Sequence, residues 1–142
     1  VSFNAIINQV IGEDENSHII NNTVAEDVIF NGDDFYLISL FQNLLDNAKK
    51  YSPDGSEINI YSESNSSKII ICISDQGVGI AEDEKAKIFD RFYRIEDEET
   101  RSFKGTGLGL FLVNQIVKMH GGKIICKNNT PCGSIFELHF KK

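Results

Sequence analysis

Two amides and an amine share one stripe of a predicted helix over residues 33–50. Asn43, Asn47 and Lys50 are spaced i, i+4 and i+7, so at about 100° per residue they lie on the same side of the helix. The stripe borders the apolar face, where an unpaired polar group costs roughly 1–3 kcal/mol. Amide oxygens suit Mg²⁺, and a lysine attracts phosphate oxygens. Taken alone, the stripe is explained more simply by loop caps or by contact with water.

A carboxylate follows a predicted buried strand. Asp75 comes directly after the nearly continuous apolar run of residues 68–74 and precedes Gly77 and Gly79. Glycine allows positive φ and the close approach of a ligand. A carboxylate beside such a gap can accept a hydrogen bond from an exocyclic amine, although an ordinary strand-ending turn has the same pattern.

Alternating glycines in residues 104–110 precede an apolar helix. Amide groups at a helix N-terminus and the helix dipole attract anions, and Lys104 and Thr106 add a cation and a hydroxyl. No Gly-Lys-Ser/Thr follows, which excludes a Walker loop, and no buried strand begins a dinucleotide-binding unit. A flexible hinge remains the alternative to a phosphate site.

The stretch between these motifs contains aromatic residues and a charged loop. Phe89 and Phe92 are predicted to anchor in the core, and the guanidinium of Arg94 could reach a terminal phosphate. A charged loop over residues 94–104 with glycines at its far end is typical of a lid.

These motifs require a framework of helices and strands to position them. Ser2 is expected to cap a helix over residues 3–12, and Asp33 or Asp34 to begin the helix that ends before Ser52-Pro-Asp-Gly. Helices are also expected at 82–89 and 108–119, and strands at 18–24, 28–30, 56–63, 68–74, 123–128 and 134–140. Neighbouring strands without strict helix alternation predict a single domain over residues 1–142. The fold class is α+β, a two-layer α/β sandwich with a mixed sheet and helices on one face.

Charge, apolar runs and cysteine spacing exclude several classes of protein. The chain of 142 residues has 14 Lys+Arg against 21 Asp+Glu, a net charge of −7, which argues against nucleic acid as a partner. No apolar run approaches the ~20 residues that span a bilayer, and the start does not resemble a signal peptide. Cys72, Cys126 and Cys132 lack C-x-x-C spacing and are predicted to be buried free thiols of a reducing compartment, the cytoplasm.

Together the motifs resemble the nucleotide-binding boxes of the Bergerat-fold ATPases, specifically the catalytic domain of sensor histidine kinases. Residues 43–52 resemble the N box (NLLDNAKKYS) and residues 75–79 the first glycine box (DQGVG). Residues 89–92 resemble the F box (FDRF) and residues 105–110 the second glycine box (GTGLGL). The family fold is a two-layer α/β sandwich, in agreement with the elements predicted above.

The resemblance implies ATP and Mg²⁺ as cofactors and gives a role to each matching residue. Asn47 would hold Mg²⁺, Asn43 would support the phosphates, and Asp75 would accept from the adenine amine, with Gly77 and Gly79 admitting the base. The residues implied to neutralise the phosphates are Lys50, Arg94 and Lys104, which with Asn43 make up the catalytic set. The further ATP contacts implied are Tyr51, Ile80, Phe92, Gly105, Thr106, Gly107, Leu108, Gly109 and Leu110.

Hydrolysing relatives carry a glutamate at the first N-box position, where this chain has Asn43. Because an amide is no general base at neutral pH, we expect phosphoryl transfer to a histidine rather than hydrolysis. The family's acceptor histidine precedes an acidic residue, whereas His18, His120 and His139 precede Ile, Gly and Phe.

The acceptor is therefore expected on an upstream helical dimerisation domain, with a response regulator as the next partner and the isolated domain monomeric. The parent protein could be anchored in the cell membrane. A serine kinase of the anti-sigma-factor type and a nucleotide-sensing module without transfer activity remain alternatives.

Overall fold

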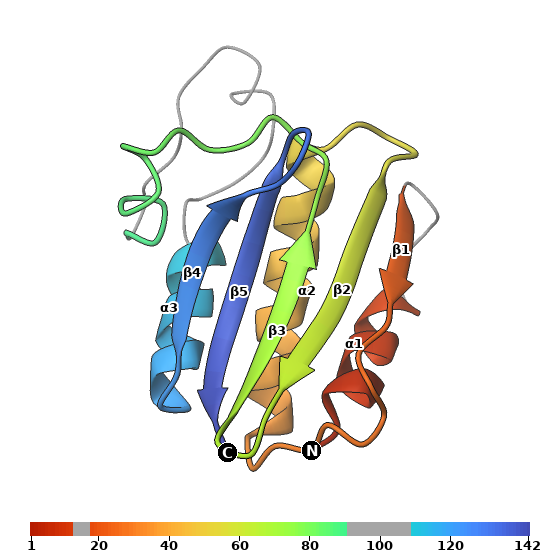
Figure 1. The fold of residues 1–142 in the computed structure, drawn as a ribbon, viewed down its shortest axis with the longest axis vertical. Helices are drawn as coiled ribbons and strands as arrows, with labels where there is room; N and C mark the ends of the chain where they lie inside the picture. Colours follow the sequence, from red (N-terminus) through yellow and green to blue (C-terminus); the bar gives the residue numbers. More distant parts are fainter. Residues whose placement is uncertain (13–17, 91–108) are drawn as a thin grey trace.

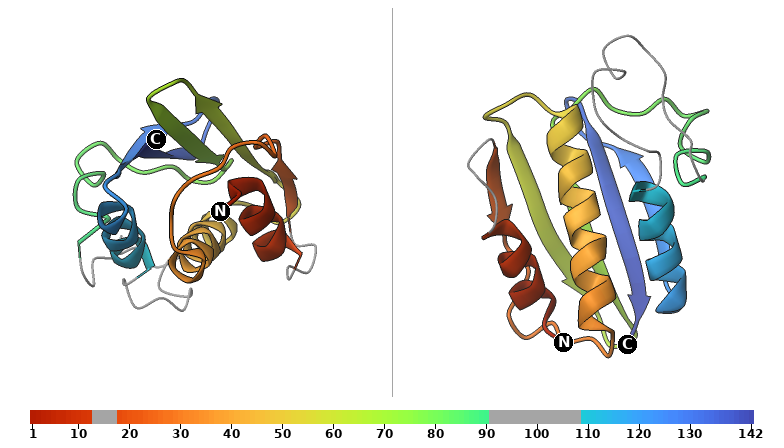
Figure 2. Two further views of the ribbon diagram at one scale, coloured as in Figure 1. Left: turned by 90° about the horizontal axis from the view of Figure 1, so that it is seen from below. Right: turned by 180° about the vertical axis from the view of Figure 1, so that it is seen from behind.

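One mixed sheet forms a layer in the computed structural model, which describes residues 1–12, 18–90 and 109–142 (Figure 1). The described strands are β1 (Ile19–Asn22), β2 (Glu57–Ser64), β3 (Lys68–Ser74), β4 (Lys123–Asn128) and β5 (Ser134–Lys141). Their order is β1-β2-β3-β5-β4, with β1 parallel to β2 and the other neighbours antiparallel. The described helices are α1 (Phe3–Ile11), α2 (Asp34–Tyr51) and α3 (Gly109–Met119). All three cover the same face of the sheet, as the view from below shows (Figure 2), so the predicted α+β sandwich is confirmed.

The first two helices begin where the sequence predicts. The Ser2 hydroxyl accepts a hydrogen bond from the amide of Ala5 at 3.3 Å, and one Asp33 carboxylate oxygen accepts from the amide of Phe35 at 3.0 Å. Each bond satisfies an amide that has no partner inside the first helical turn. Helix α3 ends at Met119, and Gly121 in the turn that follows adopts a left-handed φ of +74°.

Strand β5 lies between β3 and β4, and this order determines what surrounds the end of β3. Ser74, the last residue of β3, pairs with Ile135 near the start of β5. The turn after β3 and the turn between β4 and β5 therefore meet at one end of the sheet (Figure 1).

The core lies between the sheet and the helices. Alternate residues of β3 (Ile69, Ile71 and Ile73) are at most 1% exposed. Cys72 and Ser74, which alternate onto the opposite face, are also buried, so the prediction of a strand buried on nearly both faces is confirmed. An aromatic group joins α1, α2 and β5 beneath the sheet: Phe3, Phe30, Phe41 and Phe140, with ring centroids 4.9–5.9 Å apart.

The predicted strand over residues 28–30 is wrong. This segment makes an isolated antiparallel bridge between Ile29 and Ser2, and the amide of Phe30 donates to the carbonyl of Val1 at 2.8 Å. The pairing stops because the partner segment becomes α1 at Phe3.

The predicted helix over residues 82–89 is also wrong, because the segment forms consecutive turns. Hydrogen bonds from Glu84 to Ala81 and from Lys87 to Glu84 span three residues, beside one four-residue bond from Ile88 to Glu84. A segment this short gains too little from its own helical bonds, so tertiary contacts determine its shape.

The three cysteines are free thiols, but the prediction that all are buried is wrong. Cys72 is buried and Cys126 is half-buried, whereas Cys132 is exposed because it lies in the turn between β4 and β5. Among the helices of the described residues, none combines the length and the apolarity that a bilayer crossing requires.

Candidate functional site

The Asp75 carboxylate lies at the end of β3 and is held from two sides. It is 4% exposed, and its Oδ1 accepts hydrogen bonds from the amides of Gly77 at 2.9 Å and Ser134 at 3.2 Å. Within the described part of the chain, no donor contacts its Oδ2. The second oxygen is therefore available to accept from a ligand.

Burial and hydrogen bonding shift the pKa of the Asp75 carboxyl in opposite directions. Desolvation raises the pKa of Asp75, and the amides of Gly77 and Ser134 offset part of that rise because they favour the charged form. The net pKa is above the ordinary value of an aspartate. The folded protein therefore holds an aspartate whose charge is only partly compensated by its own chain.

Gly77 is needed because the turn packs directly against the end of α2. A Cβ built on Gly77 would lie 2.2 Å from the carbonyl oxygen of Tyr51, and the next amide, that of Val78, donates to this oxygen at 3.2 Å. The carbonyl at the C-terminus of α2 thus has a partner in the glycine turn. This contact gives Gly77 a packing role that the sequence analysis did not anticipate.

Gly79 and Gly133 bring the two turns of this end of the sheet together. Gly79 has a left-handed φ of +77°, and its backbone faces the carbonyl of Gly133. Gly133 has a φ of +100°, and a Cβ there would lie 2.0 Å from the carbonyl oxygen of Asp75. Both the conformation and the available space therefore require glycine at position 133.

The polar stripe of α2 lies on the shoulder of the helix, as predicted. Asn43, Asn47 and Lys50 are all half-buried. The side-chain amide of Asn43 donates to the carbonyl of Ser39 at 2.8 Å, so its nitrogen is satisfied within the helix. Among residues 1–12, 18–90 and 109–142, no hydrogen bond involves the side chain of Asn47.

The start of α3 lies beside this stripe. A Cβ on Gly109 would approach the Asn43 side-chain oxygen to 3.3 Å, so the first residue of α3 and the first residue of the N box face each other. Leu110 and Ile80 are half-buried and pack against the core. The structure thus brings three predicted segments together: the α2 stripe, the Asp75 turn and the N-terminus of α3.

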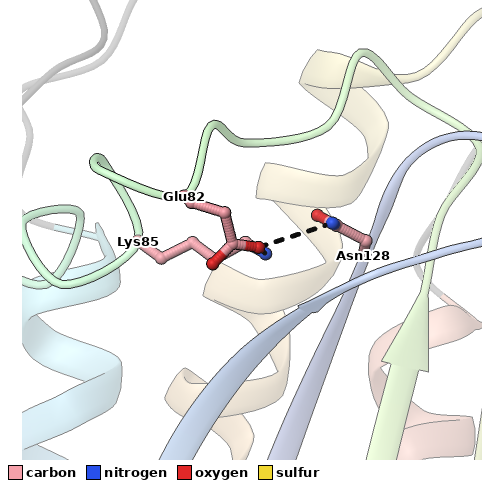
Figure 3. Close-up of polar contacts among 3 residues, drawn as sticks. All are labelled: Glu82, Lys85 and Asn128. Atoms are coloured by element: carbon pink, nitrogen blue, oxygen red, sulfur yellow. Dashed lines mark hydrogen bonds and ion pairs between the residues drawn. The ribbon is translucent and has the colours of Figure 1, made fainter.

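The turn segment of residues 81–90 is tied to the edge strand. Glu82 forms an ion pair with Lys85 and accepts a hydrogen bond at 3.5 Å from Asn128, the last residue of β4 (Figure 3). Phe89 packs edge-on against Phe136 of β5, with ring centroids 6.2 Å apart. The prediction that Phe89 is a core anchor is confirmed.

Several predicted site residues lie outside the described residues. They are Phe92, Arg94, Lys104, Gly105, Thr106, Gly107 and Leu108. The predicted lid and most of the second glycine box belong to this group.

Two neighbours of Asp75 were missed by the sequence analysis. Asn129 lies in the turn between β4 and β5 and donates to the Asp75 carbonyl at 2.7 Å, and Ser134 is the first residue of β5. The Pro-Cys-Gly run at residues 131–133 marks a turn, but nothing in it indicates which strand end the turn meets.

The arrangement can recognise a flat polar group and bind an anion. A fixed carboxylate with one unused oxygen selects an amine donor, while the amide oxygens and lysine of the α2 stripe and the N-terminus of α3 favour a metal-bound phosphate. Among the described residues, no group of three or more His, Cys, Asp or Glu side chains could hold a metal ion. A cation here would depend on few protein oxygens and on its ligand.

Comparison with known proteins agrees with this geometry. Residues 32–142 match the family described as "Histidine kinase-, DNA gyrase B-, and HSP90-like ATPase". The sensor protein SrrB of Staphylococcus aureus is 42% identical over 100 residues, which is 70% of this chain and 17% of SrrB. The chain therefore spans about a sixth of the length of that curated relative.

Solved structures resemble the whole chain. The mycobacterial sensor histidine kinase MprB matches with a TM-score of 0.85 at 29% identity, over 99% of this chain and 95% of that one. The catalytic domain of histidine kinase ThkA matches with a TM-score of 0.85 at 28% identity and the same coverage.

The packing at Gly133 predicts that alanine substitution lowers the free energy of unfolding much more there than at another left-handed glycine. Gly133→Ala should lower the free energy of unfolding by about 3 kcal/mol or more, because its Cβ has no room. Gly55, with a φ of +82° and nothing within 4 Å of a Cβ, is the matched control. Gly55→Ala should cost roughly 1–2 kcal/mol, the cost of the conformation alone. Equal losses in urea denaturation would contradict the packing argument.

Proposed function

Because the chain belongs to the family of histidine kinase-, DNA gyrase B- and HSP90-like ATPases, we propose that it is the ATP-binding catalytic domain of a two-component sensor histidine kinase. The observation that carries the proposal is the buried Asp75 carboxylate, fixed through Oδ1 in a turn that packs against the C-terminal end of α2. In this proposal residues 1–142 form one catalytic domain of a longer protein that operates in the cytoplasm.

Base recognition is assigned to the turn after β3. Asp75 Oδ2 accepts from the 6-amino group of adenine, which is a donor, and rejects a 6-oxo group, which is an acceptor. Gly79 lets the turn bend beside the base, and Tyr51 and Ile80 are assigned as further contacts of the base. Gly77 secures the turn to the end of α2.

The phosphates are assigned to the α2 stripe and the N-terminus of α3. Lys50 neutralises their charge, Asn43 supports them, and the amides near Gly109 and Leu110 donate to them. The same role is proposed for Arg94, Lys104 and residues 105–108 on the basis of the sequence resemblance. Phe92 is proposed as a further nucleotide contact on the same basis.

A magnesium ion is proposed at Asn47. Its half-buried amide oxygen is a neutral, hard donor that takes part in none of the hydrogen bonds described, which fits a Mg²⁺ shared with phosphate oxygens. When bound, the ion neutralises charge that develops on the transferring phosphoryl group. The chain's own contribution is to hold the triphosphate and to orient its terminal group.

The arrangement favours transfer over hydrolysis. The nitrogen of Asn43 is bonded to Ser39, and an amide does not take a proton from water at neutral pH. In the proposed reaction the bond from the γ-phosphorus to its bridging oxygen breaks and a bond to an imidazole nitrogen forms, leaving ADP. Such a transfer needs positioning and charge neutralisation rather than a base on this domain.

The histidines of the chain support an acceptor located elsewhere. His18 Nε2 lies 3.2 Å from the carbonyl oxygen of Ser52, and His139 Nε2 lies 3.1 Å from a Glu137 carboxylate oxygen. His120 bonds through both ring nitrogens, to the carbonyl of Ile116 at 2.8 Å and the amide of Asp33 at 3.1 Å. We therefore place the acceptor on a dimerisation domain of the parent protein, from which a response regulator takes the phosphoryl group.

Transfer to a separate acceptor tests the proposed activity. The domain, mixed with Mg·ATP and the helical acceptor domain of its parent, should produce acid-labile, base-stable phosphate on that acceptor. The domain alone should produce none, because its histidines are engaged in the fold. Acid-stable phosphate would indicate a serine kinase instead. Nucleotide binding without any transfer would indicate a sensor module.

Asp75→Asn should reverse the base preference. The amide oxygen can still accept from Gly77 and Ser134, but its NH₂ group replaces Oδ2 and faces the adenine amine donor to donor. We expect affinity for ATP to fall about 10- to 100-fold, and affinity for inosine triphosphate to hold or rise, in calorimetric titrations. Because burial raises the pKa of Asp75, removal of the charge should not lower the melting temperature. An unchanged ratio of the two affinities would contradict the assignment.

Asn47→Ala should raise the magnesium concentration needed for ATP binding. In a titration of Mg²⁺ at fixed ATP, followed by the melting temperature, the midpoint should rise about tenfold, whereas ATP binding in the presence of a chelator should not change. Gln42→Ala removes an amide of the same helix that bonds to Asp46, and it serves as the control. An identical Mg²⁺ midpoint in the wild type and in Asn47→Ala would contradict the assignment of Asn47 as a metal ligand.

A further inference from the structure

The turn between β4 and β5 is attached to the base-recognition turn by one side chain. Asn129, half-buried, donates its Nδ2 hydrogen to the main-chain carbonyl of Asp75 at 2.7 Å, across 54 residues of sequence. Its Oδ1 accepts from the amide of Thr130 at 2.9 Å. Its own amide donates to the carbonyl of Gly133 at 3.0 Å. Asn129 thus closes its own turn and holds that turn against Asp75.

The two bonds between Ser134 and Asp75 depend on the position of this turn. Ser134, the next residue after Gly133, donates to Asp75 Oδ1 at 3.2 Å and accepts from the Asp75 amide at 2.9 Å. The bond to Oδ1 is longer than the Asn129 bond and ends at a buried group that carries charge. A small displacement of the turn therefore weakens one of the two contacts that hold Asp75 Oδ1, the other being the amide of Gly77 at 2.9 Å.

We propose that Asn129 is a positioning residue that determines how strongly the site prefers a 6-amino purine over a 6-oxo purine. The proposal rests on the proposed function, in which Asp75 Oδ2 accepts from the adenine amine. Asn129 itself bonds to main-chain atoms and acts through Asp75. Because hydrogen bonds weaken steeply with misalignment, the amine contact is lost before the charge-based phosphate contacts are affected.

A merely structural role makes a different prediction. If Asn129 only stabilised the fold, its loss would lower the melting temperature and weaken all nucleotides alike. If it positions the carboxylate, its loss weakens ATP more than inosine triphosphate, which differs at the group that Asp75 contacts. The ratio of the two dissociation constants separates these roles because the triphosphate is common to both ligands.

The test uses two variants and a matched control. Asn129→Asp keeps the shape and the acceptor for the Thr130 amide but replaces the donor to the Asp75 carbonyl with an oxygen. Asn129→Ala removes the donor without adding charge. Asn65→Asp makes the same chemical change in the turn between β2 and β3, where Oδ1 accepts from the amides of Ser67 and Lys68 and the NH₂ group makes no described bond.

Dissociation constants for ATP and inosine triphosphate are measured by calorimetry below the melting temperature of each variant. Asn129→Asp and Asn129→Ala should weaken ATP by about tenfold and inosine triphosphate by less than about twofold, with Asn65→Asp unchanged. An unchanged ratio of the two dissociation constants, whether both rise equally or neither changes, would overturn the role of Asn129 without contradicting ATP binding by the domain. A wild-type domain that binds neither nucleotide would instead overturn the proposed function.

Discussion

A buried carboxylate must be held by hydrogen bonds, and the candidate site is organised around that requirement. Asp75 is 4% exposed, and its Oδ1 accepts from one amide of its own turn and from the amide of Ser134 at the start of β5. Removing a carboxylate from water is unfavourable unless hydrogen bonds replace those of the solvent. Two main-chain amides therefore donate to one of its oxygens. The other oxygen remains for a ligand, and in the proposed function it distinguishes an amine donor from a carbonyl acceptor.

Close backbone contacts relate this carboxylate to the helix that carries the polar stripe. The carbonyl of Tyr51 occupies the space that a side chain at position 77 would need, and the carbonyl of Asp75 does the same at position 133. These contacts leave little room for the turn to move relative to α2. In the proposed function, the turn that contacts the base and the stripe that contacts the phosphates are thus held at a fixed separation, as a ligand with both groups requires.

In the proposed function, this chain contributes binding and orientation of the nucleotide. The side-chain nitrogen of Asn43 donates to the carbonyl of Ser39, and each histidine has a hydrogen-bond or ion-pair partner within the fold. Phosphoryl transfer through a loose transition state requires mainly that the enzyme position the reacting groups and neutralise the phosphate charge. A domain with these properties can leave the nucleophile to another part of its protein.

Local patterns in the sequence determined the helices, most strands and half of the site. The caps at Ser2 and Asp33, the half-buried stripe on α2 and the carboxylate at the end of β3 follow from periodicity and turn chemistry, which act between near neighbours. The turns at residues 82–89 and the exposure of Cys132 were decided by tertiary contacts that outweigh local preference. Only the tertiary structure supplied Asn129 and Ser134, because they reach Asp75 across 54 and 59 residues. That proximity depends on β5 lying between β3 and β4, and strand order is selected by the burial of the whole sheet rather than by any local pattern.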